Sequence, residues 1–93
     1  MGDQRTVQGR VTGRVQGVAF RASFRRQALS LSLHGWVRNL PDGAVGFLVQ
    51  GDSDDVARMI DWAGRGPRLA RVDEVAVRDV ERDPALDGFE IRY

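Results

Sequence analysis

Residues 5–33 read RTVQGRVTGRVQGVAFRASFRRQALSLSL, and within them one strand gives way to one helix. From Arg5 to Val15 the apolar and small residues fall on alternate positions, a period of two that is typical of a half-buried strand. The glycines in this stretch would weaken a strand interior, so we expect a β-bulge or a close backbone approach there. From Phe20 to Leu33 apolar residues recur at helical spacing without Pro or Gly, which predicts an amphipathic helix. We expect Gly35, just past its end, to terminate it.

A β-hairpin is predicted next. Trp36–Asn39 reads as a short strand, and Leu40–Gly43 reads as a turn in which Pro41 presets φ and Gly43 adopts a left-handed conformation. Apolar residues alternate again over residues 45–49, which gives the hairpin its second arm.

The second half of the chain predicts one helix and two strands. Asp52–Asp55 supplies capping side chains and negative charge at a helix start, and apolar residues follow at helical spacing. Val72–Glu81 reads as a strand whose apolar phase slips between Val77 and Val80, which we attribute to a bulge. Residues 89–93 alternate again in a short terminal strand.

The predicted order is therefore β-α-β-β-α-β with a small strand added at the end. This order favours an α+β fold of the ferredoxin-like, split β-α-β kind, a mainly antiparallel sheet with both helices on one face. At 93 residues we expect a single domain over residues 1–93.

Composition narrows the chemistry. The chain has no Cys and one His, so disulfides, thiolate nucleophiles and zinc–thiolate or histidine-rich metal sites are excluded. All 14 basic residues are Arg, and the net charge of +1 does not favour nucleic acid or anionic lipid as a partner. Because we find neither a membrane-spanning run nor a signal peptide, we expect the protein to lie in the cytoplasm. We also expect a monomer with no metal and no cofactor.

The segment that carries chemistry is GRVQGVAFR, residues 13–21, at the junction of the first strand and the first helix. Such a junction directs free backbone N–H groups and the positive end of the helix dipole to one spot. Gly13 and Gly17 allow the backbone to curl, and Arg21 adds a planar fork of donors that suits phosphate. On spacing alone, an ordinary strand-to-helix turn with a surface Arg is the simpler interpretation.

Two longer motifs are more specific. VTGRVQGVAFR at Val11–Arg21 closely resembles the first signature of the acylphosphatase family, and GWVRN at Gly35–Asn39 resembles the second. The closing residues FEIRY are similar to the family's last strand, so the resemblance runs from about Val7 to Tyr93.

The resemblance implies a reaction and roles for particular residues. It implies that small acyl phosphates are hydrolysed to a carboxylate and inorganic phosphate, without a metal or a covalent intermediate. Arg21 matches the arginine that binds the substrate phosphate, and Asn39 matches the asparagine that orients the attacking water. The backbone N–H groups that match the family's phosphate cradle belong to Val15, Gln16, Gly17, Val18 and Ala19.

The chain departs from the family pattern at two positions. Ala19 stands where Gly is frequent, and Phe24 stands where Thr is frequent. We expect both to tune activity rather than remove it, with Phe24 weakening the hydrogen bonding that steadies the loop.

Other polar and aromatic residues are assigned ordinary roles. We expect His34 to lie near a helix end, Arg25–Arg26 to form a solvated face that can attract anions, and Asp54–Asp55 to supply capping charge. Trp36 and Trp62 are interpreted as packing residues.

The sequence disfavours two other functions and leaves a third open. The lack of Cys excludes a metallochaperone, and an RNA-binding module would need exposed aromatics, of which Phe47 is the one candidate on a central strand. A carbamoyl-phosphate-handling or non-catalytic phosphate-binding domain, like that of some hydrogenase-maturation proteins, stays open as the main alternative.

Overall fold

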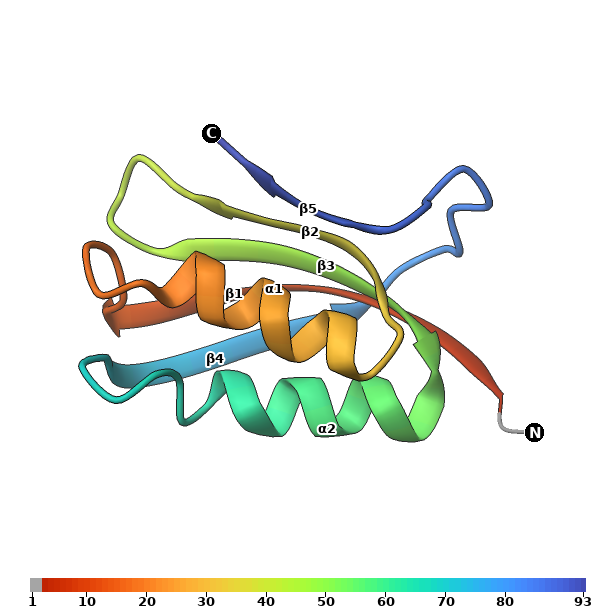
Figure 1. Ribbon diagram of the computed structural model, residues 1–93, viewed down its shortest axis with the longest axis horizontal. Helices are drawn as coiled ribbons and strands as arrows, with labels where there is room; N and C mark the ends of the chain where they lie inside the picture. The colour runs from red at the N-terminus through yellow and green to blue at the C-terminus, as the bar shows by residue number, and fades with distance from the viewer. Residues whose placement is uncertain (1–2) are drawn as a thin grey trace.

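The computed structural model describes residues 3–93, which form five strands and two helices (Figure 1). In chain order these are β1 (Gln4–Arg14), α1 (Phe20–Ser30), β2 (His34–Asn39), β3 (Val45–Asp52), α2 (Ser53–Ala63), β4 (Arg71–Asp79) and β5 (Phe89–Arg92). Neither helix in this part of the chain has the length and apolar character needed to cross a bilayer.

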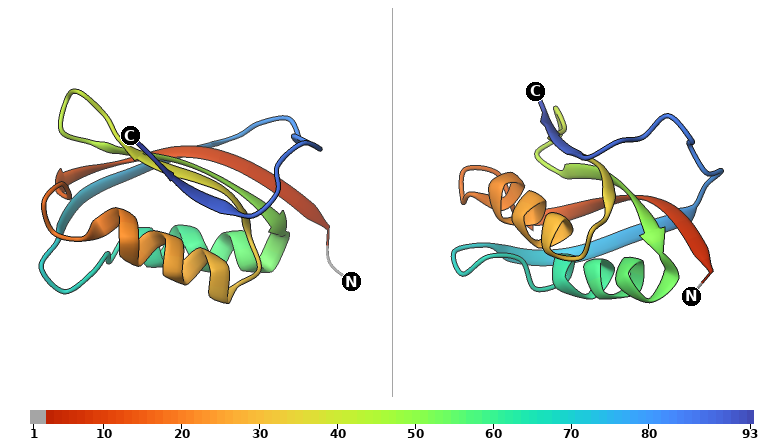
Figure 2. Two further views of the ribbon diagram at one scale, coloured as in Figure 1. Left: turned by 45° about the horizontal axis from the view of Figure 1, so that its top comes forward. Right: turned by 45° about the vertical axis from the view of Figure 1, so that its right-hand side comes forward.

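The five strands form one sheet in the order β4-β1-β3-β2-β5. The pairs among β1 to β4 are antiparallel, and β5 adds to the edge of β2 in parallel. Both helices cover the same face of the sheet, and the other face is left open (Figure 2). The predicted ferredoxin-like α+β fold is therefore confirmed, with a parallel edge strand added to the antiparallel sheet.

The directions of the strands bring three chain segments together at one end of the sheet, where β1, β2 and β5 terminate. Because β1 and β2 both run antiparallel to β3, they run in the same direction, and β5 is parallel to β2. Val11 of β1 and Asn39 of β2 both lie opposite Val45 of β3, so β1 continues for three residues beyond the level at which β2 ends. The carboxyl ends of β1, β2 and β5 therefore meet where α1 begins.

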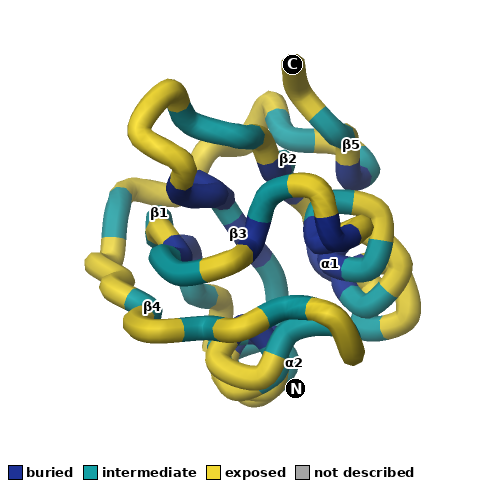
Figure 3. Tube along the Cα trace, turned by 90° about the vertical axis from the view of Figure 1, so that its left-hand side faces the viewer, coloured by how far each residue is buried: buried dark blue, intermediate teal, exposed yellow. Residues whose placement is uncertain are grey.

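The core lies between the sheet and the helices, as the buried stretches in Figure 3 show. Phe24 of α1 is fully buried, and its ring centroid lies 4.9 Å from Phe47 and 5.8 Å from both Trp62 and Phe89. A Cβ on Gly9 would overlap the Phe47 ring, so this glycine of β1 is the predicted point of close approach. Aromatic burial of this kind dominates core energetics.

The expected end of the first helix was wrong. Helix α1 ends at Ser30, and its last carbonyls accept bonds from Ser32 and Leu33, whose N–H groups bond to Leu29 and Ala28 in a Schellman motif. The left-handed residue of that motif is Ser32, at φ 57°, rather than a glycine. Gly35 instead lies within β2 at φ 148°, where a Cβ would collide with the Leu48 carbonyl of β3.

The sheet contains a bulge, but not at the position expected in the fourth strand. Pairing of β1 with β4 is regular from Val7 opposite Asp79 to Thr12 opposite Glu74, so the predicted slip between Val77 and Val80 is wrong. The register shifts between Thr12 and Gly13, which confirms the bulge expected from the glycines of β1. Val80 lies beyond the end of β4, so its side chain is not bound by the alternation of the strand.

Candidate active site

A pocket of about 210 Å³ opens at the edge of the sheet where α1 begins. The residues around it come from three separate segments: the loop between β1 and α1 with the first turn of α1, the end of β2, and the C-terminal end of the chain at β5. Gly17, Ala19, Arg21 and Asn39 all line it. Arg21 and Asn39, which lie 18 positions apart in two different motifs, therefore line one pocket as the sequence predicted.

The loop over residues 15–19 curls because two of its residues adopt left-handed conformations. Gly17 has φ 76° and Ala19, the residue before α1, has φ 61°. Val15 and Val18 bury their side chains in the core, whereas Gly17 and Ala19 are exposed. Val15 and Val18 thus anchor the loop to the core, whereas Gly17 and Ala19 face the solvent. No side chain caps the helix at Ala19, which leaves the N–H groups of the first turn without a capping acceptor.

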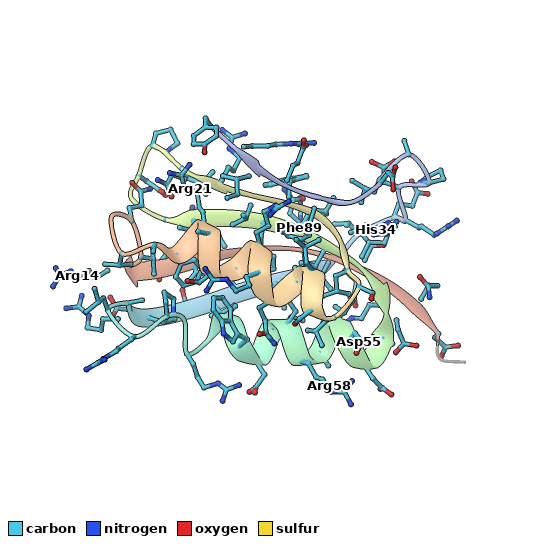
Figure 4. All side chains as sticks on the ribbon, viewed as in Figure 1. Arg14, Arg21, His34, Asp55, Arg58 and Phe89 are labelled. Carbon is cyan, nitrogen blue, oxygen red and sulfur yellow. The ribbon has the colours of Figure 1, made fainter. Side chains whose placement is uncertain are left out.

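Arg21 lies in the first turn of α1 and extends toward the C-terminal end of the chain (Figure 4). Its Nη1 donates to the Arg92 carbonyl at 3.5 Å, and its guanidinium lies over the Tyr93 ring, 4.8 Å from the centroid. Within residues 3–93 its guanidinium forms no salt bridge with a carboxylate. Most of its five N–H donors therefore remain available to an anion.

Asn39 is the last residue of β2 and lies on the face of the sheet that the helices cover. The alternation of a strand gives Asn39 the same orientation as Val37, which is fully buried beneath α1. Two residues further along, the helix no longer covers the sheet, so Asn39 is half-buried beside the pocket rather than in the core.

The Gln16 side chain ties this loop to the hairpin that carries Asn39. Its Nε2 donates to the Leu40 carbonyl at 2.8 Å and to the Ala44 carbonyl at 2.9 Å. We call these two hydrogen bonds the Gln16 staple. The sequence predicted a role only for the backbone N–H of Gln16, and no sequence pattern could have revealed its side-chain bonds. Its acceptors come into reach only because β1 and β2 end at the same edge of the sheet.

The hairpin turn has further support on its exposed side. Asp42 Oδ1 accepts from the Ala44 N–H at 3.0 Å, and Asp42 Oδ2 accepts from Arg10 at 2.8 Å. The Ala44 N–H, and after it the Arg10 side chain, lower the pKa of Asp42 below its ordinary value. Gly43 has φ 94°, as its place in the turn predicted.

A larger groove, of about 470 Å³, lies on the open face of the sheet. It is lined by Arg10, Arg38, Arg78 and Trp36, but by none of the residues to which the family resemblance assigns a role. Arg10 is held by Asp42, and Arg78 donates to Gln8. The smaller pocket, where the two motifs converge, is therefore the stronger candidate for catalysis.

Comparisons with known proteins show the family of the chain. The Acylphosphatase family model matches residues 7–91. The chain belongs to the acylphosphatase family. It is 51% identical over 82 residues to an acylphosphatase of Thermococcus kodakarensis, covering 88% of this chain and 89% of that one. It is 55% identical over 84 residues to an acylphosphatase of Aeropyrum pernix, covering 89% and 83% of the two chains.

Solved structures of the family have the same fold. The structure of an acylphosphatase from Coxiella burnetii gives a TM-score of 0.89 at 34% identity, over 97% of this chain and 94% of that one. The acylphosphatase from Bacillus subtilis gives 0.92 at 28% identity, over 98% and 100%. Full-length HypF, in a phosphate- and nucleotide-bound form, also gives 0.89 at 29% identity, and the match covers 12% of that chain.

Both departures from the family pattern have a structural place. Ala19 adopts the left-handed conformation that Gly tolerates without a Cβ clash. Phe24 points into the aromatic core, so its ring fills space between sheet and helices. The effect on activity expected for each remains a prediction.

The polar and aromatic residues to which the sequence assigned ordinary roles do not line the pocket, and two sequence interpretations need correction. His34 begins β2 at the far end of the sheet, and Asp55 pairs with Arg58 on α2 (Figure 4). Arg25 is not simply solvated, since its Nε donates to the Phe89 carbonyl at 2.9 Å. Phe47 is fully buried, so the interpretation of it as an exposed stacking aromatic was wrong.

Metal-ligating side chains do not cluster in the pocket. Residues 3–93 contain no group of three or more His, Asp or Glu side chains close enough to hold an ion. The donors around the pocket are those of backbone amides, a guanidinium and a carboxamide, which suit an anion.

The Gln16 staple predicts a loss of stability when it is removed. Gln16→Ala should lower the free energy of unfolding by about 1–2 kcal/mol, because it deletes two part-buried hydrogen bonds that each contribute about 0.5–1.5 kcal/mol net. Urea unfolding measures the change. Gln8→Ala, which removes one exposed bond to Arg78, is the matched control and should cost less than about 0.5 kcal/mol. Equal losses in the two variants would contradict the staple.

Because Ala19 has a left-handed conformation, we expect its replacement by glycine to raise the stability of the protein. Ala19→Gly relieves about 1–2 kcal/mol of backbone strain and costs about 0.4–1 kcal/mol of unfolded-chain entropy, so stability should rise by about 0.5–1 kcal/mol. Ala22→Gly, three residues on in regular helix, should instead lower it by about 0.5–1 kcal/mol. Thermal and urea melts of the pair test this, and a loss at both positions would contradict the strain.

Proposed function

We propose that this chain hydrolyses small acyl phosphates to a carboxylate and inorganic phosphate in the pocket at the start of α1. The observation that supports this most directly is that Arg21 and Asn39 line the same pocket as three residues of the loop, Val15, Gly17 and Ala19. Membership of the acylphosphatase family supports the reaction class.

The phosphoryl group of the substrate is bound by the backbone N–H groups of Val15, Gln16, Gly17, Val18 and Ala19 together with the Arg21 guanidinium. These donors are fixed before the substrate arrives, since Gln16 and the buried valines hold the loop in place. Charge that develops on the phosphoryl oxygens is therefore stabilised without reorganisation. A donor of this kind contributes about 2–4 kcal/mol to transition-state binding.

The Asn39 carboxamide orients the attacking water. Its carboxamide oxygen can accept a hydrogen bond from the water. The water oxygen forms a bond to phosphorus while the bond from phosphorus to the acyl oxygen breaks, and the carboxylate leaves with that electron pair. The proton of the water passes to a phosphoryl oxygen of the substrate, which acts as the base.

The chemistry of an acyl phosphate explains why so few side chains suffice. The leaving carboxylate has a conjugate-acid pKa near that of Asp or Glu, about 4, so it needs no general acid at neutral pH. What remains is positioning of the water and stabilisation of charge, as in other phosphoryl transfers. The loop over residues 15–19, Arg21 and Asn39 supply these two functions.

We also propose that the enzyme acts as a monomer in the cytoplasm on small-molecule substrates alone, with neither nucleic acid nor membrane as a partner. A single chain supplies every residue of the pocket, so catalysis as proposed needs no second copy. The absence of Cys means that no disulfide ties the fold to an oxidising compartment.

A second candidate is a domain that handles carbamoyl phosphate or binds phosphate without catalysis. The likeness to a segment of HypF supports it, although the chain covers 12% of that protein and 89% of the relative from Thermococcus kodakarensis. Parallel assays with benzoyl phosphate and carbamoyl phosphate distinguish the two candidates.

Two substitutions should separate phosphate binding from turnover. Arg21→Ala should lower kcat/KM for benzoyl phosphate by about 100- to 1,000-fold and weaken inhibition by inorganic phosphate, because the phosphate loses its charged donors. Asn39→Ala should lower kcat by about 100-fold and leave phosphate inhibition unchanged, because only the water loses its orientation.

Steady-state assays with inorganic phosphate as a competitive inhibitor measure both effects. Arg26→Ala is the matched control, because it removes an exposed Arg of α1 that does not line the pocket. It should leave kcat/KM for benzoyl phosphate and the inhibition constant of inorganic phosphate unchanged. Full turnover by Arg21→Ala, or weakened phosphate inhibition with normal kcat in Asn39→Ala, would contradict the assigned roles.

A further inference from the structure

The last strand and the residue after it carry apolar side chains from the core to the pocket. Phe89 of β5 is buried, and Ile91 lies opposite the buried Val37, so both face the helices. Tyr93 lies one residue beyond the end of β5, and the same alternation directs it to the side of the sheet that Ile91 faces. Both Ile91 and Tyr93 line the pocket. The first turn of α1 lies beside this end of β5, because Arg21 donates to the Arg92 carbonyl.

Tyr93 is not needed by the core. The residue is 96% exposed, and its contact in the structure is with the Arg21 guanidinium, 4.8 Å from its ring centroid. A large aromatic side chain that is exposed beside a pocket has apolar surface left to bury. Ile91 is half-buried, so part of its side chain is exposed beside the same pocket.

The geometry of Arg21 leaves room for both a phosphate and this apolar wall. A guanidinium stacks through its face and donates through its edge, so contact with Tyr93 does not use the N–H donors that a phosphate needs. A phosphate on that edge lies beside Tyr93, and the group attached to it must leave the cradle of residues 15–19. Its path runs along the side of the pocket that Ile91 and Tyr93 form.

We propose that Tyr93, with Ile91 beneath it, forms the subsite for the acyl group and gives the enzyme a preference for acyl phosphates with a planar aromatic acyl group. This rests on the proposed function, since it assigns the part of the substrate that the phosphate cradle does not hold. A benzoyl group stacks on the Tyr93 ring or packs against its edge, whereas an acetyl group is too small to cover it.

The test compares benzoyl phosphate with acetyl phosphate in the full chain. Tyr93→Ala should lower the ratio of kcat/KM for benzoyl phosphate to that for acetyl phosphate by about 2- to 10-fold, the range that one aromatic pair supplies. Inhibition by inorganic phosphate should stay unchanged. Tyr93→Phe should keep the wild-type ratio, because it retains the ring.

Trp36→Ala is the matched control, since it removes an aromatic side chain from the neighbouring strand on the open face of the sheet. It should change neither the ratio nor phosphate inhibition, and thermal melts of each variant verify folding. An equal loss for both substrates with weaker phosphate inhibition would overturn the subsite, because Tyr93 would then act only by positioning Arg21. An unchanged ratio would overturn it as well.

Failure of the proposed function has a different signature. A wild-type chain that hydrolyses neither substrate contradicts the proposed function and removes the subsite with it. An active wild-type chain whose Tyr93→Ala variant shows no change in selectivity contradicts the subsite alone.

Discussion

The tight connection between β1 and α1 is the constraint on which the proposed site depends. Five residues reverse the chain from the sheet into the helix, and they do so with left-handed conformations at Gly17 and Ala19. Val15 and Val18 fix the loop to the core, and Gln16 fixes it to the neighbouring hairpin. The anion site is thus held by packing and by hydrogen bonds, and part of its cost is backbone strain at Ala19.

The topology of the sheet explains why this loop meets the other site residues. Inserting β3 between β1 and β2 makes those two strands run in the same direction, so the loop after β1 and Asn39 at the end of β2 lie at one edge. The parallel pairing of β5 adds the C-terminal residues to the same edge. The helix dipole of α1 points its positive end there too. One fold-level arrangement therefore gathers the cradle, the guanidinium, the carboxamide and an apolar wall.

Much of this could be predicted from the sequence because local periodicity decides it. The strands and helices follow from alternation and helical spacing, and the bulge near Gly13 follows from the glycines of β1. Asp52 caps α2 as its side chain and position indicate, accepting from the Asp54 N–H.

What the sequence could not give depends on contacts between distant segments. Gly35 resembles a helix terminator, but it is a glycine because the Leu48 carbonyl leaves no space for a Cβ. The Gln16 staple, the bond from Arg25 to the Phe89 carbonyl and the contact of Arg21 with Tyr93 all join residues at least 24 positions apart. Such contacts exist only once strand order is known.

The most direct test of the central claim is an NMR titration of the ¹⁵N-labelled protein with inorganic phosphate. Chemical-shift changes should concentrate on the backbone amides of residues 15–19 and on the Arg21 side chain, with one common dissociation constant. Changes confined to Arg38 and Arg78 on the open face of the sheet, with the loop amides unmoved, would contradict it.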